Sequence, residues 1–347
     1  MSVPKALIAM SGGVDSSVAA YLTQQAKYDC IAATMLLHDS SADTSDAKAV
    51  ASKLNMPFHV LDCTAEFRNL VMDSFVGGYE AGLTPNPCVE CNRHLKFGLL
   101  LEKALEFGCQ YIVTGHYCRI RKDENGRFLL YKALDPGKDQ SYFLYSLTQH
   151  QLSHTLFPLA ELSKEQARTI AESNGFINAR KKDSQDICFI PDGDYFPFLQ
   201  QYTGKPYPAG HFLDPDGNVV GTHKNAVAYT RGQRKGLGLA MGRPVYVCSK
   251  NMESNTVTVG DNETLFNNTL VADDWNWIPF DTLRAPMRVM AKARSRMTEQ
   301  PATVYPLGDG MAKVVFDQPQ RAITTGQAVV LYDGDMVIGG GTIREVL

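Results

Sequence analysis

The chain has 347 residues, of which 44% are hydrophobic and 20% are charged, and its formal net charge is −3. These proportions are ordinary for a globular protein, and the length predicts two or three domains. No apolar run is long enough to cross a membrane, and the first residues suit a strand rather than a leader. We therefore expect a cytoplasmic protein without a membrane partner. The net charge excludes a generally basic surface, so any nucleic-acid contact must be local.

The first segments predict a strand, a glycine-rich turn and a helix. An apolar run at 6–8 precedes Ala-Met-Ser-Gly-Gly-Val-Asp-Ser-Ser at 9–17, and a second apolar run follows at 18–22. Glycines let backbone N–H groups approach an anion, while the helix N-terminus and the serine hydroxyls add donors, so this turn is predicted to cradle phosphate. It lacks the lysine of a P-loop and carries Asp15, which could hold Mg²⁺ instead. A plain turn with a capping serine is the alternative.

Further strands and helices alternate behind this turn. We expect strands at 30–37, 57–61 and 110–114 and a helix at 44–54. The alternation predicts a doubly wound, mostly parallel α/β sheet that binds its ligand at the carboxyl ends of the strands. His116 follows the last of these strands, where it is either a phosphate or ribose contact or a structural hydrogen-bonding residue.

A proline-rich loop carries two cysteines. The residues Thr-Pro-Asn-Pro-Cys-Val-Glu-Cys-Asn at 84–92 predict a stiff loop that runs into a helix at 95–107. Cys91 then lies close to a helix start with Arg93 and Lys96 nearby, which predicts a thiol pKa below its reference of about 8.5. The C-x-x-C spacing also suits half of a zinc site, but no second ligand pair accompanies it in the sequence.

Another cysteine follows a basic run. The eight cysteines are too few for a disulfide framework. In a reducing compartment, a cysteine with a distinct role is more often catalytic or metal-binding than part of a disulfide. Cys188 lies between Ile187 and Phe189, shortly after the basic run at 180–182. Taken alone, this apolar setting is typical of a buried structural cysteine.

The pattern changes from about residue 207 onward. Short alternating runs separated by Asp-Gly and Asn turns predict all-β structure. Dividing this region near residue 266 gives three predicted domains, which are 1–203, 204–266 and 267–347. The second is expected to be small and β-rich, and the third a β-barrel.

Basic residues recur in both β-rich regions. Lys292, Arg294 and Arg296 alternate and would share one face of a strand, as either a solvated surface or a set of phosphate contacts. The central region carries Arg231, Arg234 and Lys235 among glycines.

Several of these motifs together carry a resemblance. Ser-Gly-Gly-Val-Asp-Ser at 11–16 resembles the loop of the PP-loop ATP pyrophosphatases, which split ATP between its α- and β-phosphates. The resemblance extends to motifs at 85–87, 91–92, 115–117, 138–145, 186–190 and 232–238. In this order, and as far as the glycines at 339–341, the motifs closely resemble the tRNA-specific 2-thiouridylase family.

The resemblance implies an ATP-dependent tRNA-uridine 2-sulfurtransferase that inserts sulfur at C2 of the wobble uridine. ATP, with Mg²⁺, would adenylate the uridine O2, so that AMP becomes a good leaving group. Another PP-loop ligase that adenylates a small molecule is the alternative function. The implied ATP-binding residues are Ala9, Met10, Ser11, Gly12, Gly13, Val14, Asp15, Ser16, Met35 and Gly115.

The same resemblance implies roles for two cysteines. Cys188 matches the residue that receives a persulfide from an upstream sulfur-donor protein, and Cys91 matches its partner nucleophile. The pair would end as a disulfide that must be reduced. The implied loop for the target base is Asn86, Pro87 and Cys88, and the implied tRNA-binding residues are Lys138, Asp139, Gln140, Arg294 and Ser295.

Two features depart from the family pattern. Many members have Asp, in a proposed acid/base role, where this chain has Cys88, and a thiol cannot simply take over that role. Cys88, Cys91 and Cys188 could instead hold an iron–sulfur cluster. The serine-rich segment at 39–45 is also shorter than the insertion that relatives often carry there.

Overall fold

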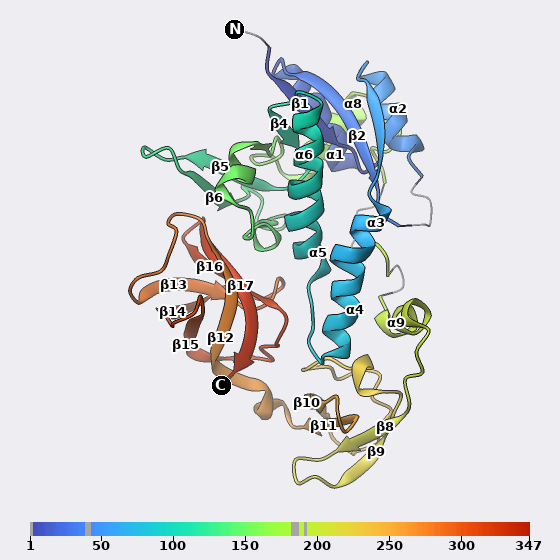
Figure 1. The fold of residues 1–347 in the computed structure, drawn as a ribbon, viewed down its shortest axis with the longest axis vertical. Helices are drawn as coiled ribbons and strands as arrows, with labels where there is room; N and C mark the ends of the chain where they lie inside the picture. The colour runs from blue at the N-terminus through green and yellow to red at the C-terminus, as the bar shows by residue number, and fades with distance from the viewer. Residues whose placement is uncertain (1–2, 39–42, 182–186, 191–192) are drawn as a thin grey trace.

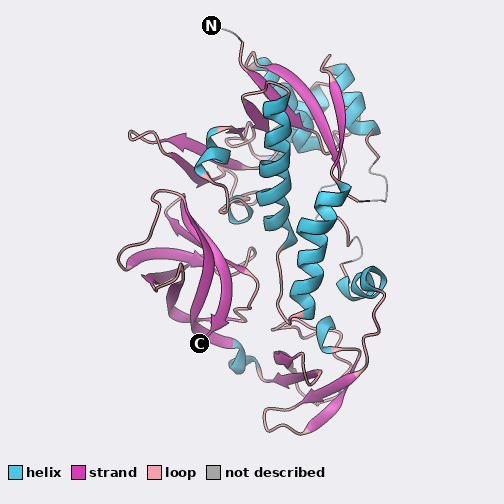
Figure 2. Cartoon of the chain, viewed as in Figure 1, coloured by secondary structure: helices cyan, strands magenta, loops and turns pink. Residues whose placement is uncertain are grey.

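The computed structural model describes residues 3–38, 43–181, 187–190 and 193–347. An α/β part at the N-terminus, drawn in blue to green, lies above a small yellow β part and an orange to red barrel (Figure 1). Two long helices run from the first part toward the other two, and strands dominate the second half of the chain (Figure 2).

The N-terminal part is built on a parallel sheet with the strand order β3-β2-β1-β4-β7. Its strands are β1 (Lys5–Ala9), β2 (Asp29–Leu36), β3 (Phe58–Asp62), β4 (Tyr111–Val113) and β7 (Thr155–Leu156). The predicted α/β sheet is thus confirmed. The order reverses between β1 and β4, and a crevice forms at the carboxyl ends of strands at such a point.

Helices cover this sheet and extend from it. Those of the α/β layer are α1 (Val14–Gln25), α2 (Ser45–Lys53), α7 (Gln149–Ser153) and α8 (Lys164–Ser173). The first long helix combines α3 (Thr64–Phe67), a π-helical segment (Arg68–Met72) and α4 (Asp73–Glu80). The second combines α5 (Pro87–Glu90), a π-helical segment (Cys91–Leu99) and α6 (Leu100–Glu106).

The central part is a four-stranded sheet with the order β10-β11-β8-β9. Helix α9 (Tyr195–Thr203) leads into it and ends at Gly204, whose φ of 63° suits glycine. Its strands are β8 (Gly210–Leu213), β9 (Val219–His223), β10 (Tyr246–Asn251) and β11 (Thr256–Gly260). Phe212 and Val257 are fully buried in its core.

The C-terminal part is a closed six-stranded barrel, because β12 pairs with both β15 and β17. Its strands are β12 (Phe266–Trp277), β13 (Met287–Lys292), β14 (Gln300–Pro306), β15 (Ala312–Arg321), β16 (Ala328–Asp333) and β17 (Met336–Val346). Alternate residues such as Val304, Val314 and Leu331 fill its interior. The predicted β-barrel is confirmed.

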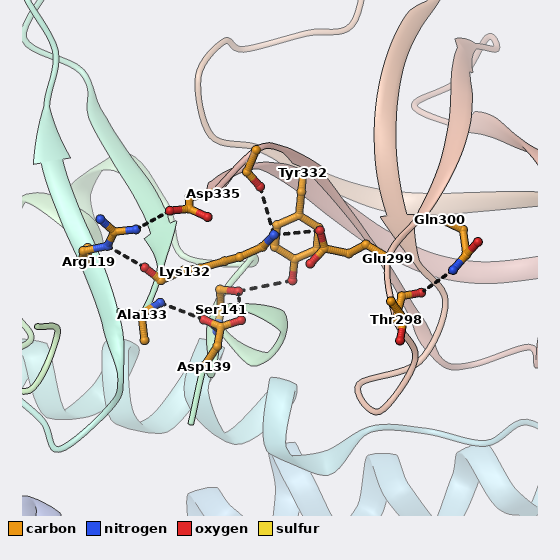
Figure 3. A network of polar contacts seen from close by, with 11 residues as sticks. Arg119, Lys132, Ala133, Asp139, Ser141, Thr298, Glu299, Gln300, Tyr332 and Asp335 are labelled. Carbon is orange, nitrogen blue, oxygen red and sulfur yellow. Dashed lines mark hydrogen bonds and ion pairs between the residues drawn. The ribbon is translucent and has the colours of Figure 1, made fainter. Parts of the chain in front are cut away.

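A hairpin of the N-terminal part, β5 (Cys118–Lys122) and β6 (Phe128–Lys132), adjoins the barrel at β17. Lys132 Nζ contacts Glu299 Oε2 at 2.7 Å and the Gly334 carbonyl at 2.9 Å (Figure 3). Arg119 pairs with Asp335 at 2.7 Å. These ion pairs hold the first part of the chain against the last.

The predicted basic stripe on a barrel strand is wrong. Strand β13 ends at Lys292, and the chain then turns, with the Met297 N–H donating to the Arg294 carbonyl. Arg294 points inward and donates to the Arg231 carbonyl at 3.1 Å and to the Thr324 hydroxyl. Residues that alternate in sequence share one face only as long as the strand continues, and this strand ends before Arg294.

Candidate active site

A pocket of about 420 Å³ opens where β1, β2 and β4 end. The loop after β1 contributes Ala9, Met10, Ser11, Asp15 and Ser16, and the end of β2 contributes Ala33, Thr34, Met35, Leu37 and His38. The segment after β4 contributes Thr114, Gly115 and His116, and other elements contribute Asp43, Ala47, Lys96, Gln140 and Cys188. Of the implied ATP-binding residues, Gly12, Gly13 and Val14 belong to the same loop but lie outside this lining. The phosphate loop and Cys188 therefore share one pocket.

The phosphate loop owes its shape to glycine and to internal hydrogen bonds. Gly12 has a φ of 72°, in the left-handed region that favours glycine. The hydroxyls of Ser16 and Ser17 both donate to the Gly13 carbonyl at 3.0 Å. A Cβ on Gly115 would lie 2.7 Å from the Ser16 nitrogen, so only glycine allows β4 to approach the loop this closely.

Asp15 is held by a cation and a hydroxyl. Lys164 Nζ lies 2.8 Å from each carboxylate oxygen, and the Tyr117 hydroxyl donates to Oδ1 at 2.8 Å. Lys164 is only 11% exposed. An ammonium at this position competes with a divalent cation for the same oxygens, so Asp15 does not fit the predicted role of Mg²⁺ ligand.

The sequence did not reveal the partners of this loop. Lys164 is the first residue of α8, and neither its sequence neighbours nor those of Asn178 indicate a contact with the loop. Asn178 is buried and its amide donates to the Gly12 carbonyl at 3.0 Å and to Ser17 Oγ at 2.9 Å. Contacts across 149 to 166 residues of sequence leave no local pattern.

The helix that carries Cys91 begins at Pro87, eight residues before the predicted start. Proline fits the first helical position because its missing N–H has no intrahelical partner there. Asn92 is 2% exposed, and its amide donates to the Phe143 carbonyl at 3.0 Å. This bond fixes the helix against the segment 141–143.

The predicted low pKa of Cys91 is wrong. The thiol is 6% exposed, and its burial raises the pKa, with Lys96 only partly opposing this effect. Cys91 is the fifth residue of the helix, beyond the first turn where the helix dipole acts strongly. The guanidinium of Arg93 is engaged by Asp274 instead.

Cys88 and Cys188 are exposed, in contrast to Cys91. The pKa of Cys188 is raised to about 11, first by partial removal from water and then by the neighbouring Cys91 and Cys88. The three thiols are therefore close enough to interact electrostatically. Asp186 of the motif 186–190 lies outside the described residues, as do residues 39–42 of the serine-rich segment.

Within 3–38, 43–181, 187–190 and 193–347, no three His, Cys, Asp or Glu side chains are placed to hold a metal ion. The arrangement of Cys88, Cys91 and Cys188 thus does not fit a cluster or zinc site.

His116 is a neutral lining residue of the pocket. Its Nδ1 lies 2.7 Å from the Thr114 hydroxyl, which fixes the ring. Burial first, and then the charge of Lys96, hold its pKa well below the ordinary value. The imidazole therefore carries no positive charge near neutral pH.

The residues implied as tRNA contacts fall in two separate places. Asp139 Oδ2 accepts from the Ser141 hydroxyl at 2.8 Å, and Ser141 Oγ lies 3.3 Å from the Tyr332 hydroxyl (Figure 3). Gln140 Oε1 accepts from the Tyr117 N–H at 3.0 Å, and Gln140 also lines the pocket. Gln140, at the end of the segment 138–140, therefore adjoins the phosphate loop.

Arg294 and Ser295 belong to the other place, the junction between the central part and the barrel. Burial lowers the pKa of Arg294, and the nearby charges of Arg321 and Arg231 act in the same direction. Arg231 donates to Asn267 Oδ1 at 2.6 Å, and Arg321 donates to Asn262 Oδ1 at 2.9 Å. Three guanidinium groups thus gather with neutral partners, a setting that attracts phosphate.

The implied target-base loop is held by the barrel. The Thr84 N–H donates to the Thr325 carbonyl at 2.9 Å, and the Gln327 amide donates to the Thr84 carbonyl at 2.8 Å. A Cβ on Gly326 would lie 2.9 Å from the Thr84 nitrogen. The barrel therefore sets the position of the residues that lead into Asn86, Pro87 and Cys88.

The described part of the chain contains no helix that is both long enough and apolar enough to span a membrane.

Sequence profiles of three families match the chain. The profile of the tRNA methyl transferase HUP domain matches residues 4–192. The profile of the tRNA methyl transferase PRC-barrel domain matches residues 197–261. The profile of the aminomethyltransferase β-barrel domain matches residues 267–343. The first covers more than half of the chain.

The full chain is similar to curated proteins of similar length. The tRNA-specific 2-thiouridylase MnmA of Clostridioides difficile (strain 630) is 47% identical over 356 residues, covering 99% of both chains. The protein of the same name from Acetivibrio thermocellus is 46% identical over 359 residues, covering 99% of this chain and 100% of its own.

Solved structures resemble the chain more distantly. The U34-tRNA thiolase NcsA from Methanococcus maripaludis, with its [4Fe-4S] cluster, is 18% identical over 57% of this chain and 66% of its own, with a TM-score of 0.35. A 4-thiouridine synthetase in complex with RNA and ATP is 16% identical over 57% and 50%, with a TM-score of 0.37. The full-length relatives and the matched profiles place the chain in the tRNA-specific 2-thiouridylase family.

Proposed function

We propose that the protein is a tRNA-uridine 2-sulfurtransferase that uses ATP to replace O2 of a wobble uridine by sulfur. The observation that carries the proposal is the shared pocket, in which the phosphate loop and Cys188 line the same space. An enzyme that only adenylates a small molecule has no need of a cysteine there. The full-length similarity to 2-thiouridylases supports the same reaction.

The first step joins uridine O2 to the α-phosphorus of ATP and releases pyrophosphate. The loop from Ala9 to Ser16 binds the phosphates through backbone N–H groups and the start of α1. Met35 and Gly115 line the same pocket, and we propose that they contact the adenosine. Lys164 neutralises Asp15, which removes a negative charge that would otherwise repel the phosphates.

The second step exchanges oxygen for sulfur. A sulfur-donor protein first leaves a persulfide on Cys188, whose exposure permits the transfer. The outer sulfur attacks C2, the C2–O2 bond breaks, and AMP leaves with that oxygen. The Cys91 thiolate then attacks Sγ of Cys188, which releases the 2-thiouridine and forms a Cys91–Cys188 disulfide. A thiol reductant returns both cysteines to the starting state.

The tRNA is proposed to contact all three predicted domains, 1–203, 204–266 and 267–347. Asn86, Pro87 and Cys88 meet the target base, and the segment 138–140 lies beside the phosphate loop. Arg294 and Ser295 at the junction of the last two domains meet the tRNA backbone, together with the guanidinium groups beside them. Such an enzyme works in the cytoplasm, where tRNA and persulfide donors are available.

The direct test is to incubate the protein with unmodified tRNA, ATP, Mg²⁺, a persulfide donor and a thiol reductant. Nucleoside mass analysis is expected to show 2-thiouridine, with AMP and pyrophosphate formed in equal amounts. Cys91→Ser and Cys188→Ser are expected to abolish the product, whereas Cys248→Ser, in the central part, leaves it unchanged. Full activity of both cysteine variants would refute the proposed sulfur route. ATP cleavage with a small molecule and without tRNA would support the alternative ligase.

A further inference from the structure

Lys96 lies where the cysteine helix meets the ATP pocket. It is half-buried on the π-helical segment that begins at Cys91, and its side chain lines the pocket together with the phosphate loop and Cys188. The side chain therefore faces the space in which the α-phosphate of ATP and the uracil ring must meet.

The ammonium of Lys96 has no carboxylate partner within the described residues. Among the described residues that line the pocket, two are carboxylates, and both are engaged elsewhere. Asp15 is paired with Lys164 at 2.8 Å, and Asp43 accepts from the Ser45 N–H at 2.9 Å. Another lysine near the loop, Lys181, is paired with Asp46 at 2.8 Å. With respect to the part of the chain that the structure describes, the charge of Lys96 thus remains available to a ligand.

The charge of Lys96 acts on four titratable groups of the site. Its charge lowers the pKa values of Cys88, Cys91 and Cys188, opposing the effect of burial, and it contributes to the lowered pKa of His116. Coulomb interactions weaken with distance, so the ammonium lies near each of these groups. This location suits a group that acts on both steps of the reaction.

We propose that Lys96 stabilises the negative charge on the α-phosphate, first during adenylation and then on AMP as it leaves. This inference rests on the proposed function. In the first step the O2–Pα bond forms, the bond from Pα to the bridging oxygen breaks, and pyrophosphate departs. In the second, the S–C2 bond forms, the C2–O2 bond breaks, and AMP carries O2 away. Lys96 keeps its proton throughout and acts as a fixed positive charge.

The test compares Lys96→Met and Lys96→Arg with a matched control, Lys103→Met. Lys103 lies on α6 of the same continuous helix, but its side chain is 41% exposed and is paired with Glu106 at 2.8 Å. Two steps are measured separately: tRNA-dependent exchange of labelled pyrophosphate into ATP for adenylation, and 2-thiouridine formation for the whole reaction.

Lys96→Met is expected to lower kcat in both assays by about 10²- to 10³-fold, as the loss of a charge-stabilising donor does elsewhere. The KM for ATP is expected to change less than about five-fold, because the loop and the adenosine contacts remain. Lys96→Arg keeps the charge and should recover a large part of the rate, and added alkylammonium ions should partly restore Lys96→Met. Lys103→Met is expected to match the wild type.

A Lys96→Met protein within about three-fold of the wild type in both assays would overturn the inference. So would a Lys96→Arg protein as slow as Lys96→Met, together with no rescue by alkylammonium ions. If Lys96→Met does not fold, Lys96→Gln and Lys96→Arg are compared in its place, with the same criteria. A wild type that forms no 2-thiouridine would refute the proposed function itself, a result distinct from any effect of Lys96.

Discussion

Arg93 and Asp274 pair across the boundary between the cysteine helix and the barrel. Arg93 Nη2 donates to Asp274 Oδ1 at 3.0 Å, and Nη1 contacts Oδ2. Arg93 lies two residues after Cys91, and Asp274 sits on β12 with a φ of 49°, beside the irregular pairing of that strand with β17. The ion pair thus holds the helix against the barrel two residues after Cys91, which is a proposed nucleophile.

Breaking this pair is expected to impair catalysis more than stability. Arg93→Met and Asp274→Asn should each lower kcat about ten-fold, since small displacements of reacting groups are costly. The melting temperature should fall by only about 3 °C or less, because partly exposed ion pairs add little stability. The double variant should be no slower than either single one, which a double-mutant cycle would measure.

The control for this prediction is Arg288→Met. Arg288 pairs with Asp317 at 2.7 Å, and both residues lie within the barrel. This pair has similar chemistry but does not reach the helix, so its loss should leave kcat unchanged. Equal effects of Arg93→Met and Arg288→Met would show that the link between helix and barrel does not matter.

Local sequence patterns predicted much of the fold. The strands of the parallel sheet and the glycine-rich turn each depend on a few neighbouring residues, so the sequence revealed them. The start of the helix at Pro87 was missed because the prolines were read as breakers, whereas proline is well suited to the first helical position. The prediction of a basic stripe was wrong because the sequence does not clearly mark the end of β13 at Lys292.

The electrostatics of the site were less predictable. Asp15 appeared available for a cation, and only the fold brings Lys164 to it across 149 residues. Cys91 appeared activated because Arg93 and Lys96 are close in sequence. The pKa of a thiol depends on burial as well as on charge, and burial is set by tertiary packing that no local pattern contains.

Gly115→Ala is expected to damage ATP binding. The added Cβ would lie 2.7 Å from both the Ser16 nitrogen and the Asp15 carbonyl carbon. The phosphate loop would have to move, so the KM for ATP in pyrophosphate exchange should rise at least about ten-fold. Gly77→Ala is the control, because this glycine is in helix α4 and nothing lies within 4 Å of its added Cβ. A Gly115→Ala enzyme with an unchanged KM would contradict this close approach of β4.

Alkylation of Cys188 is expected to accelerate steadily with pH. Only the thiolate reacts, and a pKa of about 11 leaves roughly one thiolate in a thousand at pH 8. The rate, followed by mass spectrometry of the peptide with Cys188, should therefore still rise ten-fold per pH unit from 8 to 10. In the Cys88→Ser, Cys91→Ser protein the curve should shift to lower pH, since both neighbours raise the pKa. A rate that levels off between pH 9 and 10 would show that the thiol keeps its ordinary pKa of about 8.5.

The central part is expected to gain stability as the pH rises, because of a half-buried lysine. The Nζ of Lys250 donates to the Tyr229 carbonyl at 3.0 Å and lies 5.7 Å from the centre of the Tyr79 ring. Burial lowers its pKa to about 8, from an ordinary value of 10.5. Between these two values the unfolded chain binds more protons than the folded one, so stability increases with pH. Below pH 8 both states are protonated, and the full cost of the buried charge is present.

Lys250→Met should remove this cost and the pH dependence together. At pH 7 the variant is expected to be more stable by up to about 3 kcal/mol, and the difference should shrink as the pH approaches 10. Urea unfolding followed by circular dichroism at pH 7 and 10 measures both effects. Lys235→Met, at an exposed lysine of the same part, is the control and should change neither value. A Lys250→Met protein that is less stable at pH 7 would mean that the hydrogen bond to Tyr229 outweighs the cost of burying the charge.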